Sequence, residues 1–447
     1  MRKIKIISLV FILTVFFLPN VSYAKTINEC VLQKGQSVFF SKDDLKSDSL
    51  QSSDEKIVTV SGGIITAQEV GETFCTSTNK EDKQIYKIKV IPSVGLKYLT
   101  YEPNNPKKGD TLSLYAIADE SVQNLMFKIE TSKGLFKVNA SEQIPDGKNI
   151  IYKGHFHADY NGEIKIIAHI LKENQWCEIQ DKKLTLNLDN DYKSGKGTWL
   201  PSGRCIAYIK SKEGFKSKIS VDSLSSSYDV GYGCLVFPRR PFYNDITPFE
   251  ATAMLVEKLN KGNYNILLNN FLRVNSVNIK QNQFDTLLSF TYNIGPGWLR
   301  NSDLRQIILN MPSPSKVNVA EVNSDTGLNL RMQPNIKAKI IRALHYGEKV
   351  IVLNRDNDSW YQVKTSDNKI GFCAKEYLTL TTDTVKDLDA INKKEFSDEF
   401  LLYHKAAGKC IKGLLNRRIE ELQIFFYNDY SLDGYKNKYN FECPSCH

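Results

Sequence analysis

The chain has 447 residues, 41% of them hydrophobic and 24% charged, which indicates folded domains rather than disorder and, at this length, about three of them. Lys and Arg number 59 against 50 Asp and Glu, which gives a formal net charge of +9. This excess is too small to indicate nucleic-acid binding by itself, and it suits an anionic polymer such as a bacterial wall.

The first 24 residues are typical of a secretory signal peptide. Arg2, Lys3 and Lys5 precede an apolar stretch over residues 6–18, and small residues stand at the two cleavage positions before residue 25. The apolar stretch is too short to cross a bilayer comfortably, and no other stretch approaches the length of a transmembrane helix. We therefore expect an exported protein, in the periplasm or outside the cell, with no membrane span.

Residues 25–94 and 95–192 are expected to form two β-sandwiches. Apolar and polar residues alternate with period two in segments such as 56–60, 86–91 and 106–118, and glycines mark turns between them. The first segment resembles the bacterial immunoglobulin-like modules of exported proteins. Neither segment offers a cluster of catalytic groups, so the expected role is spacing, docking or wall contact, and an inert spacer is the alternative.

Nine cysteines in an exported chain make disulfides possible, and the odd number leaves at least one thiol free or paired between chains. The best single candidate pair is Cys30 with Cys75, because both fall in the first domain. Cys443 and Cys446 form a CxxC motif near the C-terminus. A disulfide at the chain end is its expected role, since one CxxC lacks the second pair of ligands that a zinc site needs.

After a linker over residues 193–202, the hydrophobic period changes to that of helices. A short amphipathic helix is expected over residues 203–213, with Gly214 as its C-terminal stop. Thr247 and Glu250 form a capping box around a proline, which predicts the start of the next long helix. The region is therefore expected to be an α+β domain.

Several motifs in this region have a fixed order and spacing. Glu213 stands at the helix end, Asp222 follows nine residues later, and a Gly-Tyr-Gly hairpin covers residues 231–233. Residues 281–297, QNQFDTLLSFTYNIGPG, carry a helix and a turn. On these residues the chain resembles the phage-type lysozymes of glycoside hydrolase family 24, and the resemblance implies their fold and their activity.

Residues 316–382 return to β periodicity and interrupt the helical pattern. They contain Asn-Leu-Arg at 329–331, Trp-Tyr-Gln-Val at 360–363 and Gly-Phe-Cys at 371–373. On these motifs the segment resembles a bacterial SH3-like domain, a small β-barrel. The resemblance implies a module that binds wall peptides and raises the effective concentration of the enzyme on its polymer. A lid over the cleft or a docking face is the alternative.

Helical periodicity resumes at residue 385. Residues 398–426 resemble the closing helices of the same lysozymes and carry one apolar stripe. We therefore expect a split lysozyme domain of residues 197–311 and 385–430, with the SH3-like domain inserted at a surface loop and a tail over 431–447. The alternative is a truncated lysozyme followed by an unrelated helical tail.

Cleavage of a glycosidic bond needs a proton donor for the leaving oxygen and a carboxylate that activates water or stabilises positive charge at the anomeric carbon. The resemblance implies Glu213 as the acid, kept protonated by apolar neighbours, and Asp222 as the second carboxylate. Asp229 stands where the family has a threonine, and Cys234 and Leu235 replace its His-Thr. Three interpretations stay open: Asp229 binds water, Asp229 is itself the base, or the site is degenerate.

Three further residues are candidates for sugar binding. Asn293 stands where family members contact sugar, and Tyr232 has a ring that can stack on one. His404 stands where an asparagine is common, and a structural histidine is the alternative there. Arg417 and Arg418 match an arginine pair of the family and are expected to be structural.

The sequence shows no His-Glu-x-x-His, phosphate-binding loop or dinucleotide fingerprint, so we expect no metal and no cofactor. The prediction is an exported N-acetylmuramidase, a monomer that cleaves the β-1,4 bond between N-acetylmuramic acid and N-acetylglucosamine. Its partner would be peptidoglycan, both glycan strands and stem peptides. A wall-binding protein that has lost activity is the first alternative, and a redox protein that uses the C-terminal CxxC is the second.

Overall fold

The computed structural model describes residues 25–40, 50–78, 83–159, 162–188, 198–221, 227–311, 315–354, 357, 359–365, 369–406, 408–431 and 436–444. They divide into two compact units. The first holds the described residues up to Ser93 together with Phe237–Asn244, and the second holds Val94–Val236 and the described residues from Asp245 onward. The expected signal peptide lies outside the described residues.

The first unit is a small β-sandwich with one apolar core. Its two sheets have the strand orders β1-β7-β6-β3 and β2-β5-β4. The strands are β1 (Lys25–Gln33), β2 (Ser37–Phe39), β3 (Leu50–Ser52), β4 (Val58–Ser61), β5 (Ile64–Ala67), β6 (Gly71–Thr78) and β7 (Lys83–Ile91). Alternate side chains point inward, as the period-two pattern predicts, and Val38, Tyr86 and Ile88 are among the buried core residues.

Phe237–Asn244 is part of this sandwich, although in sequence it follows the Gly-Tyr-Gly hairpin. The backbone N–H of Ser37 donates to the Phe242 carbonyl at 2.7 Å, and the N–H of Phe242 donates back to Ser37 at 2.9 Å. The Phe39 and Phe242 rings meet edge to face, with centroids 6.2 Å apart. The first unit is therefore assembled from two separate stretches of chain.

The predicted disulfide between Cys30 and Cys75 is wrong, because both thiols are free. Cys30 lies on β1 and Cys75 on β6, and β7 runs between these two strands. Neighbouring strands lie about 4.8 Å apart, so strands two places apart exceed the roughly 7 Å Cα separation that a disulfide can bridge. Burial raises the pKa of the Cys75 thiol to about 11, which makes it unreactive as well as unpaired.

The second unit begins with a larger β-sandwich whose sheets have the orders β11-β10-β14-β15 and β12-β13-β9-β8. The strands are β8 (Leu96–Glu102), β9 (Thr111–Asp119), β10 (Val122–Thr131), β11 (Gly134–Asn139), β12 (Glu142–Asp146), β13 (Asn149–His157), β14 (Glu163–Lys172) and β15 (Gln175–Asn187). Leu112, Leu114 and Ala116 on β9 point into the core between the sheets. Ile117 points the other way and is equally buried, because it packs with Ala253 of a helix.

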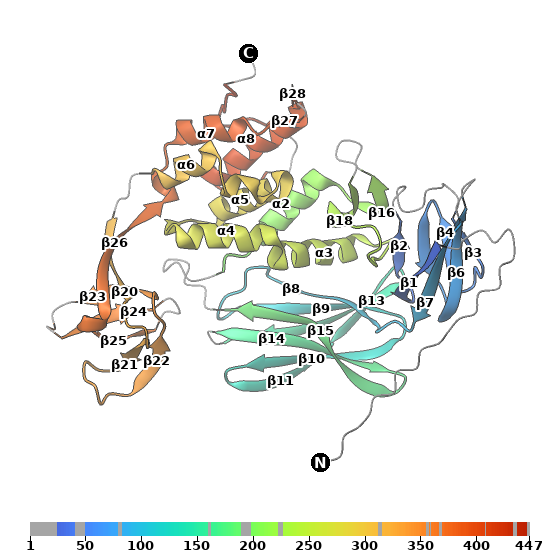
Figure 1. Ribbon diagram of the computed structural model, residues 1–447, viewed down its shortest axis with the longest axis horizontal. Coiled ribbons are helices and arrows are strands. Elements are labelled where there is room, and N and C mark those ends of the chain that lie inside the picture. Colours follow the sequence, from blue (N-terminus) through green and yellow to red (C-terminus); the bar gives the residue numbers. More distant parts are fainter. Residues whose placement is uncertain are drawn as a thin grey trace, which may run out of the picture. The chain divides into compact units, whose positions relative to one another are not determined.

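Helices follow the linker, with a three-stranded hairpin sheet between the first two. The helices are α2 (Gly203–Glu213), α3 (Pro248–Lys261), α4 (Asn263–Val274), α5 (Gln281–Ile294), α6 (Asp303–Leu309), α7 (Lys393–Leu401) and α8 (Lys412–Tyr427), with 3-10 turns at Pro296–Leu299 and Leu388–Ala390. The short strands are β16 (Lys216–Val221), β17 (Tyr228–Gly231), β18 (Cys234–Val236), β27 (Lys405–Ala406) and β28 (Lys409–Cys410). Figure 1 shows α5 among the other helices, with α3 and α4 on one side of it and α6, α7 and α8 on the other.

The predicted helix ends are confirmed by the capping contacts. Ser202 accepts a hydrogen bond from the backbone of Cys205 at the start of α2, and Gly214 ends that helix with a positive φ of 69°. Thr247 and Glu250 form the complete capping box of α3 with Pro248 in its first turn. These local signals fix where α2 ends, and hence where Glu213 stands.

The strands of the inserted β region and β19, a short strand between α4 and α5, form one sheet with the order β19-β26-β20-β23-β24-β25-β21-β22. Its strands are β19 (Val277–Asn278), β20 (Ser315–Val322), β21 (Leu328–Arg331), β22 (Ile340–Leu344), β23 (Lys349–Asn354), β24 (Trp360–Lys364), β25 (Ile370–Ala374) and β26 (Leu378–Asp387), with a 3-10 turn at Lys375–Tyr377. The first and last strands of the insert, β20 and β26, pair antiparallel from Ser315↔Val385 to Val322↔Leu378. The chain therefore enters and leaves the insert side by side, as insertion into a loop requires.

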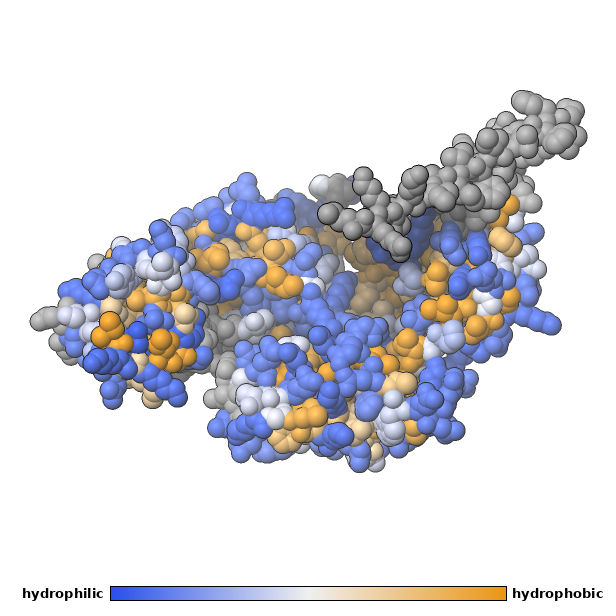
Figure 2. Space-filling model, turned by 60° about the horizontal axis from the view of Figure 1, so that its bottom comes forward, coloured by the Kyte–Doolittle hydropathy of each residue, from blue (hydrophilic) through white to orange (hydrophobic). Residues whose placement is uncertain are grey.

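Within the described residues, no helix is both long and apolar enough to cross a membrane. On the face shown in Figure 2, hydrophilic residues cover most of the surface and hydrophobic residues form several small groups. Small apolar groups are normal on the surface of a folded protein.

Candidate active site

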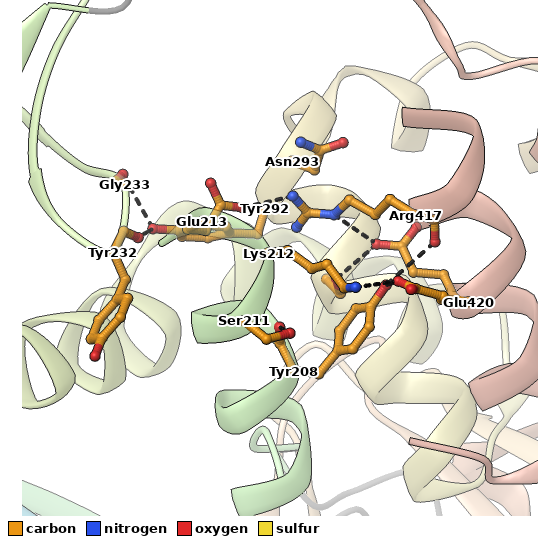
Figure 3. A network of polar contacts seen from close by, with 12 residues as sticks. Tyr208, Ser211, Lys212, Glu213, Tyr232, Gly233, Tyr292, Asn293, Arg417 and Glu420 are labelled. Carbon is orange, nitrogen blue, oxygen red and sulfur yellow. Dashed lines mark hydrogen bonds and ion pairs between the residues drawn. The ribbon is translucent and has the colours of Figure 1, made fainter. Parts of the chain in front are cut away.

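Glu213 is the last residue of α2, the first helix of this region, and its carboxylate lies beside α8, the last helix. Arg417 of α8 donates from Nη1 to Glu213 Oε1 at 2.7 Å, across 204 positions of sequence. Figure 3 shows this pair between the end of α2 and α8. The segment that follows the insert therefore completes the surroundings of Glu213, and the two segments form one site.

Arg417 is itself held by a buried network on α8 and α5. Its Nε lies 3.3 Å from Glu421 Oε1, and Ser289 of α5 donates to that same oxygen at 2.7 Å. Arg418 Nε lies 2.9 Å from the second Glu421 oxygen. Burial alone would lower the pKa of Arg417, but the charges of Glu421 and Glu213 raise it above the usual arginine value. Arg417 thus stays charged and fixed beside Glu213.

The structure places a charged partner, Arg417, beside Glu213, where apolar neighbours were expected. Its carboxylate is paired with a guanidinium, and 21% of the side chain is exposed. The interpretation of Arg417 as merely structural missed this contact, because nothing local in the sequence links α8 to the end of α2. The arginine was visible as part of a motif, and only the fold reveals what it touches.

The hairpin lies against the other carboxylate oxygen of Glu213. A side-chain carbon added at Gly233 would stand 3.2 Å from Glu213 Oε2 and 3.5 Å from the Tyr292 hydroxyl. Gly233 has a φ of +74°, which favours glycine for a second reason. The family-like glycine is therefore required at this position because the hairpin backbone passes so close to the carboxylate.

Two side chains fasten this hairpin to the helices, and neither was predicted. Tyr292 of α5 donates from its hydroxyl to the Tyr232 carbonyl at 2.8 Å (Figure 3). Lys258 of α3 donates from Nζ to the Gly233 carbonyl at 2.9 Å. Burial lowers the pKa of Lys258, which the charges of Cys234, Glu213 and Asp229 partly oppose. Lys258 stands 25 residues from the hairpin, a spacing that no local pattern marks.

Asp229 lies on β17, and its carboxylate accepts hydrogen bonds from Lys216 and Ser220. Lys216 Nζ lies 2.7 and 2.8 Å from its two carboxylate oxygens, and Ser220 donates to Oδ1 at 2.8 Å. The charges of both Asp229 and Glu213 raise the pKa of Lys258 against the effect of its burial. Asp222, the other predicted partner of Glu213, lies outside the described residues.

Of the three predicted sugar-binding residues, two border the Glu213 site. Asn293 at the end of α5 accepts a hydrogen bond from Arg418 Nη2 at 2.8 Å, which fixes its amide near α8. Tyr232 stands in the hairpin with most of its ring buried beside Phe215, centroids 5.7 Å apart. Little of that ring is left to stack on a sugar.

His404 was expected at the cleft, and this prediction is wrong. The side chain is fully buried, with Nδ1 2.6 Å from the Leu401 carbonyl and 3.8 Å from Cys443 Sγ. His404 therefore has the structural role that was the alternative prediction. Cys446, the second cysteine of the CxxC motif, lies outside the described residues. No three His, Cys, Asp or Glu side chains among the described residues gather as a metal site would require.

Comparison with known proteins identifies two parts of the chain. The Phage lysozyme family model matches residues 210–321, and the Bacterial SH3 domain model matches residues 326–379. An endolysin of Bacillus phage PZA is 30% identical over 105 residues, which are 23% of this chain and 38% of that protein. The chain thus spans well under half the length of this relative.

Two solved structures are similar to the chain at low identity. The muramidase domain of SpmX from Asticaccaulis excentricus has a TM-score of 0.27 and 16% identity, covering 50% of this chain and 95% of its own. An endolysin from Escherichia coli O157:H7 phage FAHEc1 has a TM-score of 0.28 and 17% identity, covering 53% and 99%. Because both TM-scores lie below 0.5, neither similarity bears on the chemistry of this chain.

The fold and the two matches define a multidomain protein that combines N-terminal β-sandwiches, an α+β lysozyme-like domain and a small SH3 domain. The segment that matches the Phage lysozyme model, residues 210–321, includes Glu213. Residues beyond 379 lie outside both matches, so the placement of Arg417 beside Glu213 comes from the structure alone.

Proposed function

We propose that this protein is a peptidoglycan hydrolase, and specifically an N-acetylmuramidase. It would cleave the β-1,4 bond between N-acetylmuramic acid and N-acetylglucosamine. The observation that carries the proposal is the carboxylate of Glu213, which ends α2 inside the phage-lysozyme match and is held by Arg417 at 2.7 Å. A positioned, partly exposed carboxylic acid is the group that protonates a glycosidic oxygen.

The two oxygens of Glu213 have different surroundings, which suggests a division of labour. Oε1 is occupied by Arg417, while Oε2 faces the backbone of Gly233, where no side chain stands. In the proposed reaction the proton leaves from Oε2 to the leaving sugar oxygen as the glycosidic bond breaks. A water molecule then adds to the anomeric carbon, and its released proton restores the acid.

The second carboxylate is either Asp222 or Asp229. The two oxygens of Asp229 already face Lys216, so its proposed role is to fix charge near the anomeric carbon rather than to take a proton from water. Asp222→Asn and Asp229→Asn, assayed side by side, separate the two assignments. The variant with the larger fall in kcat identifies which aspartate is the second carboxylate.

A second candidate function is wall binding without catalysis. The observation that favours it is the contact of Asp229 with Lys216 and Ser220, in which each carboxylate oxygen already accepts at least one hydrogen bond. In this alternative the lysozyme domain would still bind glycan.

Two further properties belong to the proposal. The SH3 domain would bind the wall and keep the enzyme on its insoluble substrate, which raises the local enzyme concentration. The basic and apolar N-terminus would direct export to the periplasm or the medium. Deletion of the SH3 domain should weaken sedimentation with whole walls more than it weakens hydrolysis of soluble glycan.

The test is digestion of purified peptidoglycan by the mature protein, followed by mass spectrometry of the soluble products. A muramidase leaves N-acetylmuramic acid at the new reducing end, and borohydride reduction labels that sugar. Reduced N-acetylglucosamine would overturn the bond assignment. Equal release of muropeptides by the wild type and Glu213→Gln would exclude Glu213 as the acid. Wall binding with no release would favour the alternative.

A further inference from the structure

A pocket lies between the second β-sandwich and the lysozyme-like domain, inside the second unit. Its walls come from β8 and β9 of the sandwich and from α2 and α3 of the lysozyme-like domain. Figure 1 shows α3 along the sandwich, with β8 and β9 beneath it. The cavity measures about 170 Å³. Pockets that take a whole small molecule measure about 300–1,000 Å³, so this one suits a single unit of a longer polymer.

The pocket is preformed because the sandwich is packed firmly on α3. Lys97 of the sandwich pairs with Glu250 of α3 at 3.0 Å, and the Glu250 side chain is only 2% exposed. Beside this pair, the Tyr115 and Phe249 rings meet edge to face with centroids 5.5 Å apart. A buried ion pair and an aromatic contact hold the two walls in a fixed geometry.

The lining combines apolar surface with two opposite charges. Tyr115, Phe249 and Val256 contribute apolar and aromatic surface, while Lys210 and Glu102 contribute an ammonium and a carboxylate. Glu102 accepts one hydrogen bond, from the Tyr115 hydroxyl at 3.2 Å, and keeps further acceptor capacity. A neutral sugar would use neither charge fully, whereas a peptide with free amino and carboxyl groups matches both.

Lys210 is the group that most needs a ligand. In the described part of the chain its ammonium makes no hydrogen bond and no ion pair within 4 Å, and its contact is with the face of the Tyr232 ring at 5.1 Å. Burial lowers its pKa, and the charge of Glu102 opposes that change. A partly buried cation with unused donors favours a carboxylate ligand.

The pocket is connected to the proposed catalytic residue. Lys210 and Glu213 are three positions apart on α2, so they lie close along one side of the helix. The Tyr232 ring under Lys210 belongs to the hairpin residue before Gly233, which abuts Glu213. A polymer bound at Glu213 can therefore reach the pocket with a short branch.

We propose that this pocket binds a diamino-acid unit of the stem peptide attached to the glycan strand that is being cut, with Lys210 for a free carboxylate and Glu102 for the side-chain amino group. The proposal rests on the proposed function for the identity of the ligand. It makes the second β-sandwich part of the substrate-binding surface. The protein would then prefer peptide-bearing glycan over the same glycan without peptides.

The first experiment compares soluble glycan strands that carry stem peptides with the same strands after amidase treatment. For Lys210→Met and Glu102→Gln we expect KM on peptide-bearing strands to rise roughly tenfold, the loss of one charge-assisted contact, and KM on stripped strands to rise less. Lys148→Met, an exposed lysine of the same sandwich, is the matched control and should change neither KM. Equal effects of Lys210→Met on both substrates would overturn the proposal.

The second experiment measures binding without catalysis. Free stem tetrapeptide is titrated calorimetrically into Glu213→Gln and into Glu213→Gln with Lys210→Met, and thermal melts confirm that both are folded. A roughly tenfold weaker Kd for the double variant supports the pocket, and equal affinities would overturn it. If no protein hydrolyses either glycan, the proposed function fails, while this titration still decides whether the pocket binds peptide.

Discussion

The two sides of Glu213 are built in different ways. On the α8 side, charged side chains surround the carboxylate, since Arg417 pairs with Glu213 and is itself held by Glu421. On the hairpin side, backbone faces the carboxylate, and Lys258 and Tyr292 hold that backbone through its carbonyl groups. The comparison separates the residues that hold the Glu213 carboxylate in place from the residues that hold the backbone beside it.

The largest expected effect comes from the acid that both sides share. Glu213→Gln should lower the rate of peptidoglycan cleavage by about 100- to 10,000-fold, the usual contribution of a general acid, with little change in thermal stability. The measurement is the release of reducing ends per enzyme. Glu257→Gln, an exposed glutamate of α3, is the control and should keep the wild-type rate.

On the α8 side, loss of the Arg417 charge should lower both the free energy of unfolding and the rate of hydrolysis. Arg417→Met leaves Glu213 without its partner and removes one of the cations beside buried Glu421, so we expect a loss of about 3 kcal/mol in the free energy of unfolding. Urea denaturation measures that loss, and the hydrolysis assay should show a fall in kcat. Arg300→Met, at an exposed position, should change neither quantity. An unchanged kcat for Arg417→Met would mean that the ion pair does not position the acid.

On the hairpin side of Glu213, the substitution Gly233→Ala should lower activity more than Gly109→Ala does. Gly233→Ala forces a side chain to a φ of +74° and 3.2 Å from Glu213 Oε2, so we expect a stability cost of about 1–2 kcal/mol together with reduced kcat. Gly109→Ala has a similar φ of +90° but open space around it. It should show the stability cost alone, and equal kcat for the two variants would contradict the role assigned to Gly233.

The smallest expected effect is a change in pH dependence at Lys258. Because burial lowers the pKa of Lys258 in the folded protein, the unfolded chain binds more protons between the lowered value and the ordinary lysine value near 10.5. Wild-type stability should therefore rise with pH across that window relative to Lys258→Met. Urea denaturation of both proteins from pH 7 to 10.5 checks the sign. A difference between the two proteins that stays constant with pH would contradict it.

Local patterns predicted the helix ends well and long-range partners poorly. The capping box at Thr247 and the glycine stop at Gly214 are properties of a few adjacent residues, and the structure confirms both. The contact of Arg417 with Glu213 spans 204 positions and depends on where a whole inserted domain begins and ends. Motif order suggested that the helices belong together, but no pattern could say which side chain of α8 meets the acid.

The incorrect predictions for the Cys30–Cys75 disulfide and for His404 have the same origin. Cys30 and Cys75 share a domain, and His404 shares a motif position, but neither fact fixes a distance or a burial. The strand order places β7 between the two cysteines, and the packing of the chain around Cys443 buries the histidine. Topology decides such contacts, because two residues of one domain can lie on strands that never touch.

The paired strands β20 and β26 have a consequence for the construction of the protein. Their register runs without a shift from Ser315↔Val385 to Val322↔Leu378. A segment that replaces the residues between Val322 and Leu378 therefore has to span only the distance between two paired strands. A short turn between Val322 and Leu378 would convert the pair into a simple hairpin and shorten the loop that folding has to close. The helical segments before and after the insert would stay connected through this strand pair. The SH3 domain could therefore be replaced by another domain at the same position.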